Sequence, residues 1–214
     1  MNKQGSLTVI SGFSGAGKGT IMRELLKRHP EYALSVSVTT RKPRPGEVDG
    51  KDYFFLSQEE FDKLVAEDGL LEHAGYVDHC YGTPRAYVEK AMAEGKDVLL
   101  EIEVQGARQV KEKRGDAILL FVTPPSAAEL EKRLYGRGTE TEEVIKGRME
   151  RAAKEAEEMS WYDYLIVNDD LDEAVELVHH TIQEAKNAPL RQEAFIAGIK
   201  KELEAVTAGS AKKS

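Results

Sequence analysis

The strongest constraint on the fold is a glycine-rich run near the start of the chain, Gly12-Phe13-Ser14-Gly15-Ala16-Gly17-Lys18-Gly19-Thr20. An apolar, β-rich segment, residues 7–11, precedes it, and apolar residues at helical spacing, residues 21–26, follow it. A strand, a glycine-rich turn and a helix in that order predict a phosphate-binding loop, because glycines let backbone N–H groups converge on phosphate oxygens. The helix N-terminus adds positive potential, and Lys18 is placed to reach the outer phosphates of a nucleoside triphosphate.

The residue after the loop lysine departs from the usual pattern. A Ser or Thr hydroxyl normally follows the lysine and meets magnesium, whereas this chain has Gly19 there and Thr20 one position further on. We therefore expect the metal contact to come from Thr20 or from water.

Composition limits the class of protein. The 214 residues carry a net charge of −8, which argues against a general nucleic-acid-binding surface. Cys80 is the one cysteine, so an internal disulfide is excluded and a reducing compartment is indicated. The sequence shows no apolar run of about 20 residues and no apolar signal region at its start. These features predict a cytoplasmic protein with no membrane partner.

Strands and helices alternate along the chain, which predicts an α/β fold with a mostly parallel sheet flanked by helices. Two segments interrupt it: a β-rich insert, and a helical hairpin that carries several arginines. The expected strands are 7–11, 33–38, 51–56, 70–76, 97–104, 117–123 and 164–167. The expected division is a core with a C-terminal helix (1–36, 86–125 and 161–208), the insert (37–85), the hairpin (126–160) and a disordered tail (209–214).

Arg41 and Arg44 lie three residues apart in a proline-rich, rigid loop of the insert. Two guanidinium groups on a stiff backbone suit bidentate binding of a second phosphate, to which Tyr53 and Tyr81 could add phenolic donors. The alternative is a solvated basic turn.

A second arginine cluster lies on the helical hairpin and consists of Arg133, Arg137, Arg148 and Arg151. Helical spacing puts the first two on one face and the last two on one face. Closing arginines can compensate the negative charge of a phosphoryl group in transfer. The alternative is a surface helix on which these arginines form ion pairs with neighbouring glutamates.

Polar residues mark the ends of two strands, where ligands bind in such sheets. Glu101 and Glu103 lie two residues apart at the end of one predicted strand, and we expect one to face a metal-bound water and the other a substrate base. Asn168 follows the last strand, where it could contact the base of the triphosphate or cap the next helix. The adjacent pair His179 and His180 diverges on a helix and is not expected to form a metal site.

Together these motifs resemble the guanylate kinase family over about residues 5–186. The resemblance rests on residues 12–20, Ser37 to Glu47, Tyr81-Gly82-Thr83, Gly136 to Thr141 and Val167 to Asp170. It implies transfer of the γ-phosphoryl group from ATP to GMP or dGMP, with Mg²⁺, on a core that carries a GMP-binding insert and a closing lid.

The resemblance also implies roles for single residues. ATP would be bound by Gly12, Ser14, Gly15, Ala16, Gly17, Lys18, Gly19, Thr20 and, near the adenine or ribose, Asn168. GMP would be bound by Ser37, Arg41, Arg44, Tyr53, Glu72, Tyr81, Thr83 and Glu103, with Ser37, Glu72 and Glu103 on the guanine. Catalysis would depend on Lys18, Arg41, Arg133, Arg137 and Arg148, and the metal on Thr20 and Glu101, through water or directly.

The acceptor assignment has a chemical reason. Guanine offers N1–H and an exocyclic amine, two donors that suit an ionised carboxylate, whereas adenine presents an acceptor at N1. Family members usually carry aspartates where this chain has Glu101 and Glu103. Two alternatives stay open: a binding module without turnover, and a related kinase acting on AMP or a ribose bisphosphate, for which the pair Gly19-Thr20 is the support.

Overall fold

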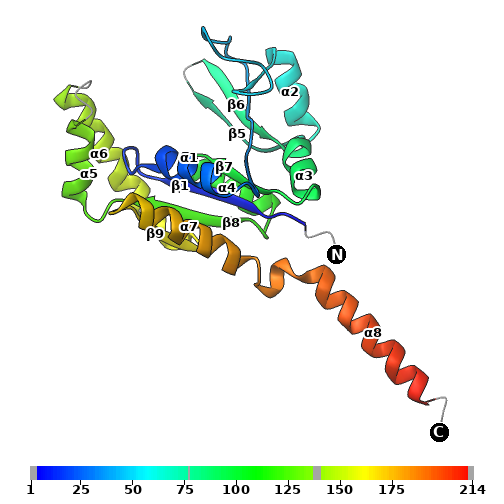
Figure 1. The fold of residues 1–214 in the computed structure, drawn as a ribbon. Coiled ribbons are helices and arrows are strands. Elements are labelled where there is room, and N and C mark those ends of the chain that lie inside the picture. The colour runs from blue at the N-terminus through cyan, green and yellow to red at the C-terminus, as the bar shows by residue number, and fades with distance from the viewer. Residues whose placement is uncertain (1–3, 77, 137–140, 212–214) are drawn as a thin grey trace.

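A computed structural model describes residues 4–76, 78–136 and 141–211. Its main sheet has five parallel strands in the order β2-β7-β1-β8-β9 (Figure 1). The strands are β1 (Leu7–Gly12), β2 (Tyr32–Leu34), β7 (Asp97–Glu101), β8 (Ile118–Thr123) and β9 (Tyr164–Val167). The predicted α/β fold with a parallel sheet flanked by helices is confirmed.

Four helices pack around this sheet because each has an apolar face. They are α1 (Lys18–Arg28), α3 (Arg85–Ala93), α4 (Val104–Lys113) and α7 (Leu171–Ala185). α1 packs against α7, α3 against β7, and α4 against β1. Strands β1 and β8 are buried along nearly their whole length, so the loop that follows β1 starts from the most rigid part of the molecule.

The insert forms a separate four-stranded sheet in the order β4-β3-β6-β5. Its strands are β3 (Val38–Thr39), β4 (Phe54–Phe55), β5 (Leu70–Tyr76) and β6 (His79–Pro84). One helix, α2 (Gln58–Ala66), packs on it and begins with a capping box between Ser57 and Glu60. The insert's own buried apolar cluster consists of Val38, Phe61 and Leu70, a much smaller core than that of the main sheet, which Leu71 of β5 joins.

Two predicted strands of this region are wrong. The single strand expected over 33–38 is divided: β2 pairs with β7 in the main sheet, and the chain then leaves to form β3 of the insert. The Ser35 N–H still donates to Leu99 O at 3.0 Å, so the change of sheet occurs after that residue. The strand expected over 51–56 is reduced to β4, because turns that involve Val48 and Asp52 take up the preceding residues.

The helical hairpin consists of α5 (Ala127–Tyr135) and α6 (Glu142–Ala156). Ser126 caps α5 and Thr141 caps α6, and each side chain accepts a hydrogen bond from the backbone N–H three residues further on. Among the described residues of α6, only Ile145 and Ala152 are fully buried. Leu130 and Leu134 of α5 are buried in the main core as well, so a few apolar side chains of each helix attach the hairpin to the core.

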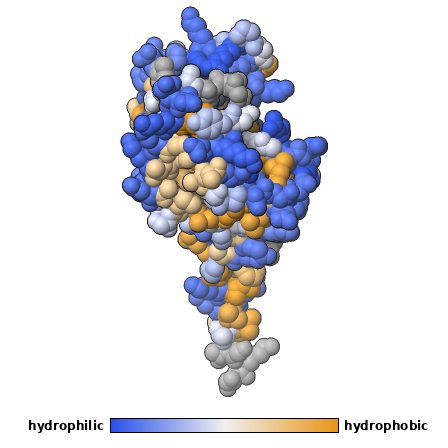
Figure 2. Space-filling view, turned by 90° about the vertical axis from the view of Figure 1, so that its left-hand side faces the viewer, coloured by the Kyte–Doolittle hydropathy of each residue, from blue (hydrophilic) through white to orange (hydrophobic). Residues whose placement is uncertain are grey.

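The C-terminal helix α8 (Glu193–Ala211) projects from the body of the protein (Figure 1). Figure 2 shows apolar side chains along it, and those exposed are Phe195, Ile199, Leu203 and Val206. The prediction of disorder from residue 209 is wrong as far as Ala211, since the helix continues to that residue, and 212–214 lie outside the described residues. Within the described ranges, none of the helices has the length and apolarity needed to cross a membrane.

Candidate active site

The glycine-rich run forms a loop between β1 and α1 whose backbone requires glycine. Gly12, Gly15 and Gly17 have φ of 145°, 96° and 94°, in the region that L side chains rarely adopt. A Cβ on Gly12 would also lie 2.1 Å from Val122 O. The loop then turns directly into α1, so the N–H groups of the first helical turn point toward it.

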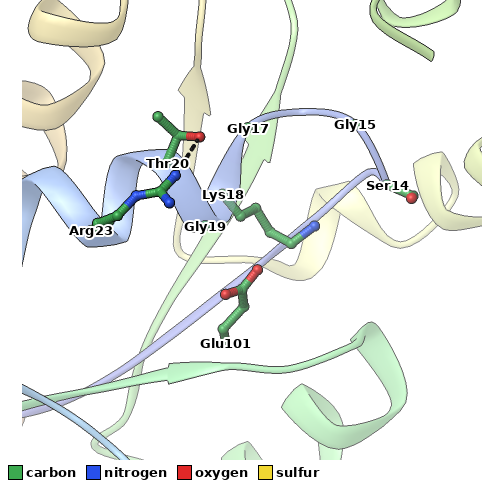
Figure 3. A pocket seen from close by; sticks show the side chains of 8 residues that line it. All are labelled: Ser14, Gly15, Gly17, Lys18, Gly19, Thr20, Arg23 and Glu101. Atoms are coloured by element: carbon green, nitrogen blue, oxygen red, sulfur yellow. Dashed lines mark hydrogen bonds between the residues drawn. The ribbon is translucent and has the colours of Figure 1, made fainter. Parts of the chain in front are cut away.

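Lys18 is the central cation of this loop (Figure 3). Its ammonium donates to Gly12 O at 2.8 Å and to Phe13 O at 3.1 Å. Burial lowers the pKa of Lys18, while the nearby Glu101 carboxylate acts in the opposite direction. The lysine borders a cavity of about 400 Å³ lined by Ser14, Gly15, Gly17, Gly19, Thr20, Arg23 and Glu101.

The two expected metal contacts lie beside the same cavity. Glu101 is the last residue of β7 and points toward Lys18 (Figure 3). A Cβ on Gly19 would lie 3.8 Å from Glu101 Oε2, so the missing side chain leaves the space in front of the carboxylate open. The Thr20 hydroxyl accepts a hydrogen bond from Arg23 Nη2 at 3.3 Å. Hard oxygen donors of this kind suit Mg²⁺.

Asn168 packs against the glycine-rich loop and holds it by a hydrogen bond. Its side chain is 7% exposed, and Nδ2 donates to Ala16 O at 2.7 Å. A Cβ on Gly17 would lie 2.4 Å from that nitrogen, so this glycine is required by close packing as well as by its φ. The cap of α7 is Asp170, which accepts from Glu173 N, and not Asn168. Sequence reasoning missed the supporting role of Asn168, since the contact joins residues 152 positions apart.

The insert gathers three of the expected phosphate-binding residues. The Arg41 guanidinium lies 5.4 Å from the centre of the Tyr53 ring, and the Tyr53 ring lies 6.1 Å from the ring of Tyr81. Glu47 holds Arg41 in a bidentate pair with both N···O distances at 2.9 Å. The bonds from Arg41, and then the bond from the Arg44 N–H, lower the pKa of Glu47 to about 2. This carboxylate therefore occupies the guanidinium face that suits a phosphate.

Glu72 on β5 is the most deeply buried carboxylate of the predicted site. It is 7% exposed and accepts a hydrogen bond of 2.6 Å from Thr83 Oγ1. Burial raises the pKa of Glu72, and the bond from Thr83 acts against that shift. A Cβ on Gly106 would lie 2.9 Å from Glu72 Oε2, so the carboxylate faces the first turn of α4, across the junction of insert and core.

The predicted position of Glu103 in a strand is wrong. β7 ends at Glu101, and Glu103 precedes the first residue of α4 with its side chain 68% exposed. Glu103 Oε1 instead pairs with Arg151 Nη2 of α6 at 2.6 Å, and Arg151 also bonds Glu155. The strand is shorter than predicted because the chain turns into α4 immediately after Ile102, whose carbonyl accepts from Ser11 Oγ at 2.8 Å.

Two arginines of the helical hairpin lie on the donor side of the site, and one of them, Arg148, contacts the glycine-rich loop itself. Arg133 Nη1 donates to Asn168 O at 2.9 Å, and Arg148 Nη1 contacts Ser14 Oγ at 3.3 Å. Arg137 lies outside the described residues. The other predicted residues lie on the insert: Ser37 O accepts from Phe54 N, and Arg44 is exposed.

The parallel sheet, the glycine-rich loop before α1 and the flanking helices define a P-loop NTPase-type protein that carries a second, inserted sheet. The family model for guanylate kinase matches residues 4–185, and the chain belongs to the guanylate kinase family. It is 55% identical over 184 residues to a guanylate kinase of Streptococcus thermophilus strain CNRZ 1066, covering 86% of this chain and 88% of that protein. A guanylate kinase of Synechococcus sp. strain CC9902 is 51% identical, with 86% and 98% covered.

A solved structure is also similar. The crystal structure of guanylate kinase from Anaplasma phagocytophilum has a TM-score of 0.68 and 32% sequence identity, covering 88% of this chain and 90% of that one. The family match ends at the last residue of α7, so α8 lies beyond it.

Proposed function

We propose that the chain catalyses the reversible, Mg²⁺-dependent transfer of the γ-phosphoryl group of ATP to GMP or dGMP, giving ADP and GDP or dGDP. The observation that carries the choice of acceptor is the buried Glu72 carboxylate beside Thr83. An ionised carboxylate matches the N1–H and exocyclic amine of guanine, whereas an adenine acceptor would leave it facing a lone pair. Glu103 and Ser37 are proposed to complete the guanine contacts from the rim of the site.

The acceptor phosphate is proposed to bind at Arg41, with Arg44, Tyr53 and Tyr81 as further donors. Arg41 already lies against the Tyr53 ring, so the phosphate has to replace only the Glu47 carboxylate. Bidentate geometry is kept in that exchange. The acceptor is an already ionised phosphate oxygen, so the reaction needs no general base.

In the transfer step, an oxygen of the acceptor phosphate forms a bond to the γ-phosphorus, and the bond from that phosphorus to the bridging oxygen breaks. The electron pair of the broken bond remains on ADP. Lys18 and the lid arginines Arg133, Arg137 and Arg148 are proposed to stabilise the charge on the equatorial oxygens. Their contribution is positioning and electrostatics, which the existing contacts of Arg133 and Arg148 to the donor side support.

Thr20 and Glu101 are proposed to hold Mg²⁺, directly or through water. Their oxygens border the phosphate cavity, and the absence of a side chain at Gly19 leaves room in front of Glu101. When bound, the ion would neutralise charge on the donor phosphates.

A coupled ADP-release assay with a panel of acceptors tests this function. We expect turnover with GMP and dGMP, little with AMP or a ribose bisphosphate, and loss of turnover when Mg²⁺ is chelated. A higher kcat/KM for AMP than for GMP would show the assignment of Glu72 to be wrong. Failure of every nucleoside monophosphate to yield ADP would favour a binding module.

A further inference from the structure

A second cluster of metal-ligating side chains lies at the far end of α1, outside the nucleotide site. One nitrogen of His29, one nitrogen of His179 and one carboxylate oxygen of Glu31 all lie within 4.8 Å of one another. The three residues come from the end of α1, the turn before β2, and the middle of α7. We propose that His29, Glu31 and His179 form a binding site for Zn²⁺ or a similar transition-metal ion.

His29 is the least satisfied member of the cluster. Its Nε2 is buried and, among the described residues, has no hydrogen-bond partner. Its Nδ1 lies 3.8 Å from Glu31 Oε1, which is beyond hydrogen-bond distance. Buried polar atoms are rarely left without a partner, and a bound ion would supply one here. A lone pair of this imidazole is thus available for a ligand.

His179 is held in place by a chain of hydrogen bonds. Its Nδ1 lies 2.9 Å from the Tyr32 hydroxyl, and Gln183 Nε2 donates to that hydroxyl at 3.1 Å. When Nδ1–H donates to the tyrosine oxygen, Nε2 carries the free lone pair. Metal-binding histidines usually have such a partner on the second nitrogen, because it fixes the tautomer and the ring orientation.

The ligand set favours zinc over magnesium. Two imidazoles and one carboxylate are the ligands of many three-residue zinc sites, whose fourth position is open to water. Mg²⁺ prefers oxygen ligands alone. The Glu31 side chain is 40% exposed, so water can reach the open position from its side.

The geometry also shows which movement the ion requires. The two rings are stacked, with centroids 3.8 Å apart and planes within 10° of parallel. Lone pairs lie in the ring planes, so one ring must tilt for both to converge on an ion at about 2.0–2.1 Å. We assign that tilt to His29, which lacks the hydrogen bonds that hold His179.

The site is remote from the chemistry. α1 begins at Lys18 and has 11 residues, so its far end lies about 16 Å from the phosphate loop. Because α1 packs against α7, an ion at this end would join the two helices. The proposal therefore concerns stabilisation of the helix pair and is independent of the proposed function.

Titration of the full, nucleotide-free chain with ZnCl₂ in a buffer that does not chelate metals tests the proposal. We expect one equivalent to bind with micromolar or tighter affinity and to raise the Tm. Gln substitutions at His29, Glu31 and His179 should each weaken binding by more than about tenfold, and Tyr32→Phe by about tenfold. The rate of GMP phosphorylation in Zn²⁺-free buffer should be unchanged in the Glu31→Gln variant.

His180→Gln is the matched control, since His180 is exposed and adjacent to His179 on the same helix. It should bind Zn²⁺ like the unaltered protein. Equal loss in His180→Gln and His179→Gln would overturn the proposed ligand set. The proposal would also be overturned if the unaltered protein did not bind Zn²⁺ at micromolar concentration, or if the Glu31→Gln variant bound Zn²⁺ as well as the unaltered protein. Glu31 is partly exposed, so this variant should fold and the test does not depend on the folding of the histidine variants.

Discussion

The donor and acceptor halves of the active site are built in different ways. The donor loop lies between β1 and α1, beside strands that are almost entirely buried, and Asn168 fixes it through a buried hydrogen bond. The acceptor half lies on a small sheet whose own buried cluster has three apolar residues. Arg41, the residue proposed to bind the acceptor phosphate, is held by a partly exposed carboxylate, Glu47. The donor half is therefore preformed, whereas the acceptor half must exchange one anion for another.

The largest expected effect is on the preformed half. Lys18→Ala should lower kcat by about 10²–10³-fold, because a donor aimed at the transferring phosphoryl group is removed. The protein should still fold. Burial lowers the pKa of Lys18, which means that the folded state disfavours the charged ammonium group, so removing this group should not destabilise the fold. Steady-state kinetics and the Tm measure the two effects. Lys27→Ala, an exposed lysine of the same helix, is the control, and near-normal turnover of Lys18→Ala would contradict the role.

Glu72→Gln tests the acceptor half at its buried end. The KM for GMP should rise by about 10- to 150-fold, because hydrogen bonds to a charged group are lost. The same substitution should raise the stability of the folded protein at neutral pH, although it weakens GMP binding. Since the pKa of Glu72 is raised in the folded protein, ionisation costs stability as the pH rises from the ordinary value of 4.5 through the raised value.

The glutamine variant should therefore unfold at a higher temperature than the unaltered protein at neutral pH, with the difference vanishing in acid. Melting curves from pH 4 to pH 8 measure it. Glu67→Gln, an exposed residue just after α2, should show neither effect. A lower Tm for Glu72→Gln at neutral pH would mean that burial does not oppose the charge.

The variant Asn168→Ala tests whether the hydrogen bond from Asn168 to Ala16 O keeps the donor loop rigid. Loss of the amide leaves Ala16 O without its partner in a buried position, at a cost of about 1–3 kcal/mol in stability. We also expect the KM for ATP to rise by about tenfold, a factor worth about 1.4 kcal/mol of binding. Chemical denaturation and initial rates measure these quantities. Asn187→Ala is the control at an exposed position, and an unchanged KM would assign Asn168 to stability alone.

The sequence predicts best those elements whose bounds are specified by local signals. Strand β9 has the predicted bounds, and β1 and β8 differ by one residue from the predicted 7–11 and 117–123, because apolar runs specify these strands locally. The capping box before α2 is likewise local. These elements belong to the core or carry their own start signals, so no distant contact is needed to define them.

Other features depend on contacts between segments that are distant in the sequence. Glu103 leaves its strand because the chain turns into α4 after Ile102, and Asn168 serves the loop through Ala16. His29 and His179 are 150 positions apart and meet only because α1 packs on α7. A single sequence shows periodicity and motif order, and neither reports which segments come together.

Glu47→Gln tests the exchange of anions and has the smallest expected effect. Without the competing carboxylate, the KM for GMP should fall by about two- to fivefold, because the phosphate no longer has to displace one partner of a single, partly exposed ion pair. Stability in acid should change as well. The pKa of Glu47 lies at about 2, below the ordinary value of 4.5, so its stabilising contribution is present above pH 4.5 and is lost as the pH falls toward 2.

The variant should consequently lose less stability than the unaltered protein between pH 4.5 and pH 2, as measured by denaturant unfolding at each pH. Glu59→Gln, an exposed residue of α2, is the control for a general change in charge. A higher KM for GMP in Glu47→Gln would mean that the carboxylate orients Arg41 for the phosphate. In that case the acceptor half would be as preformed as the donor half, and the difference between the two would reduce to the size of their cores.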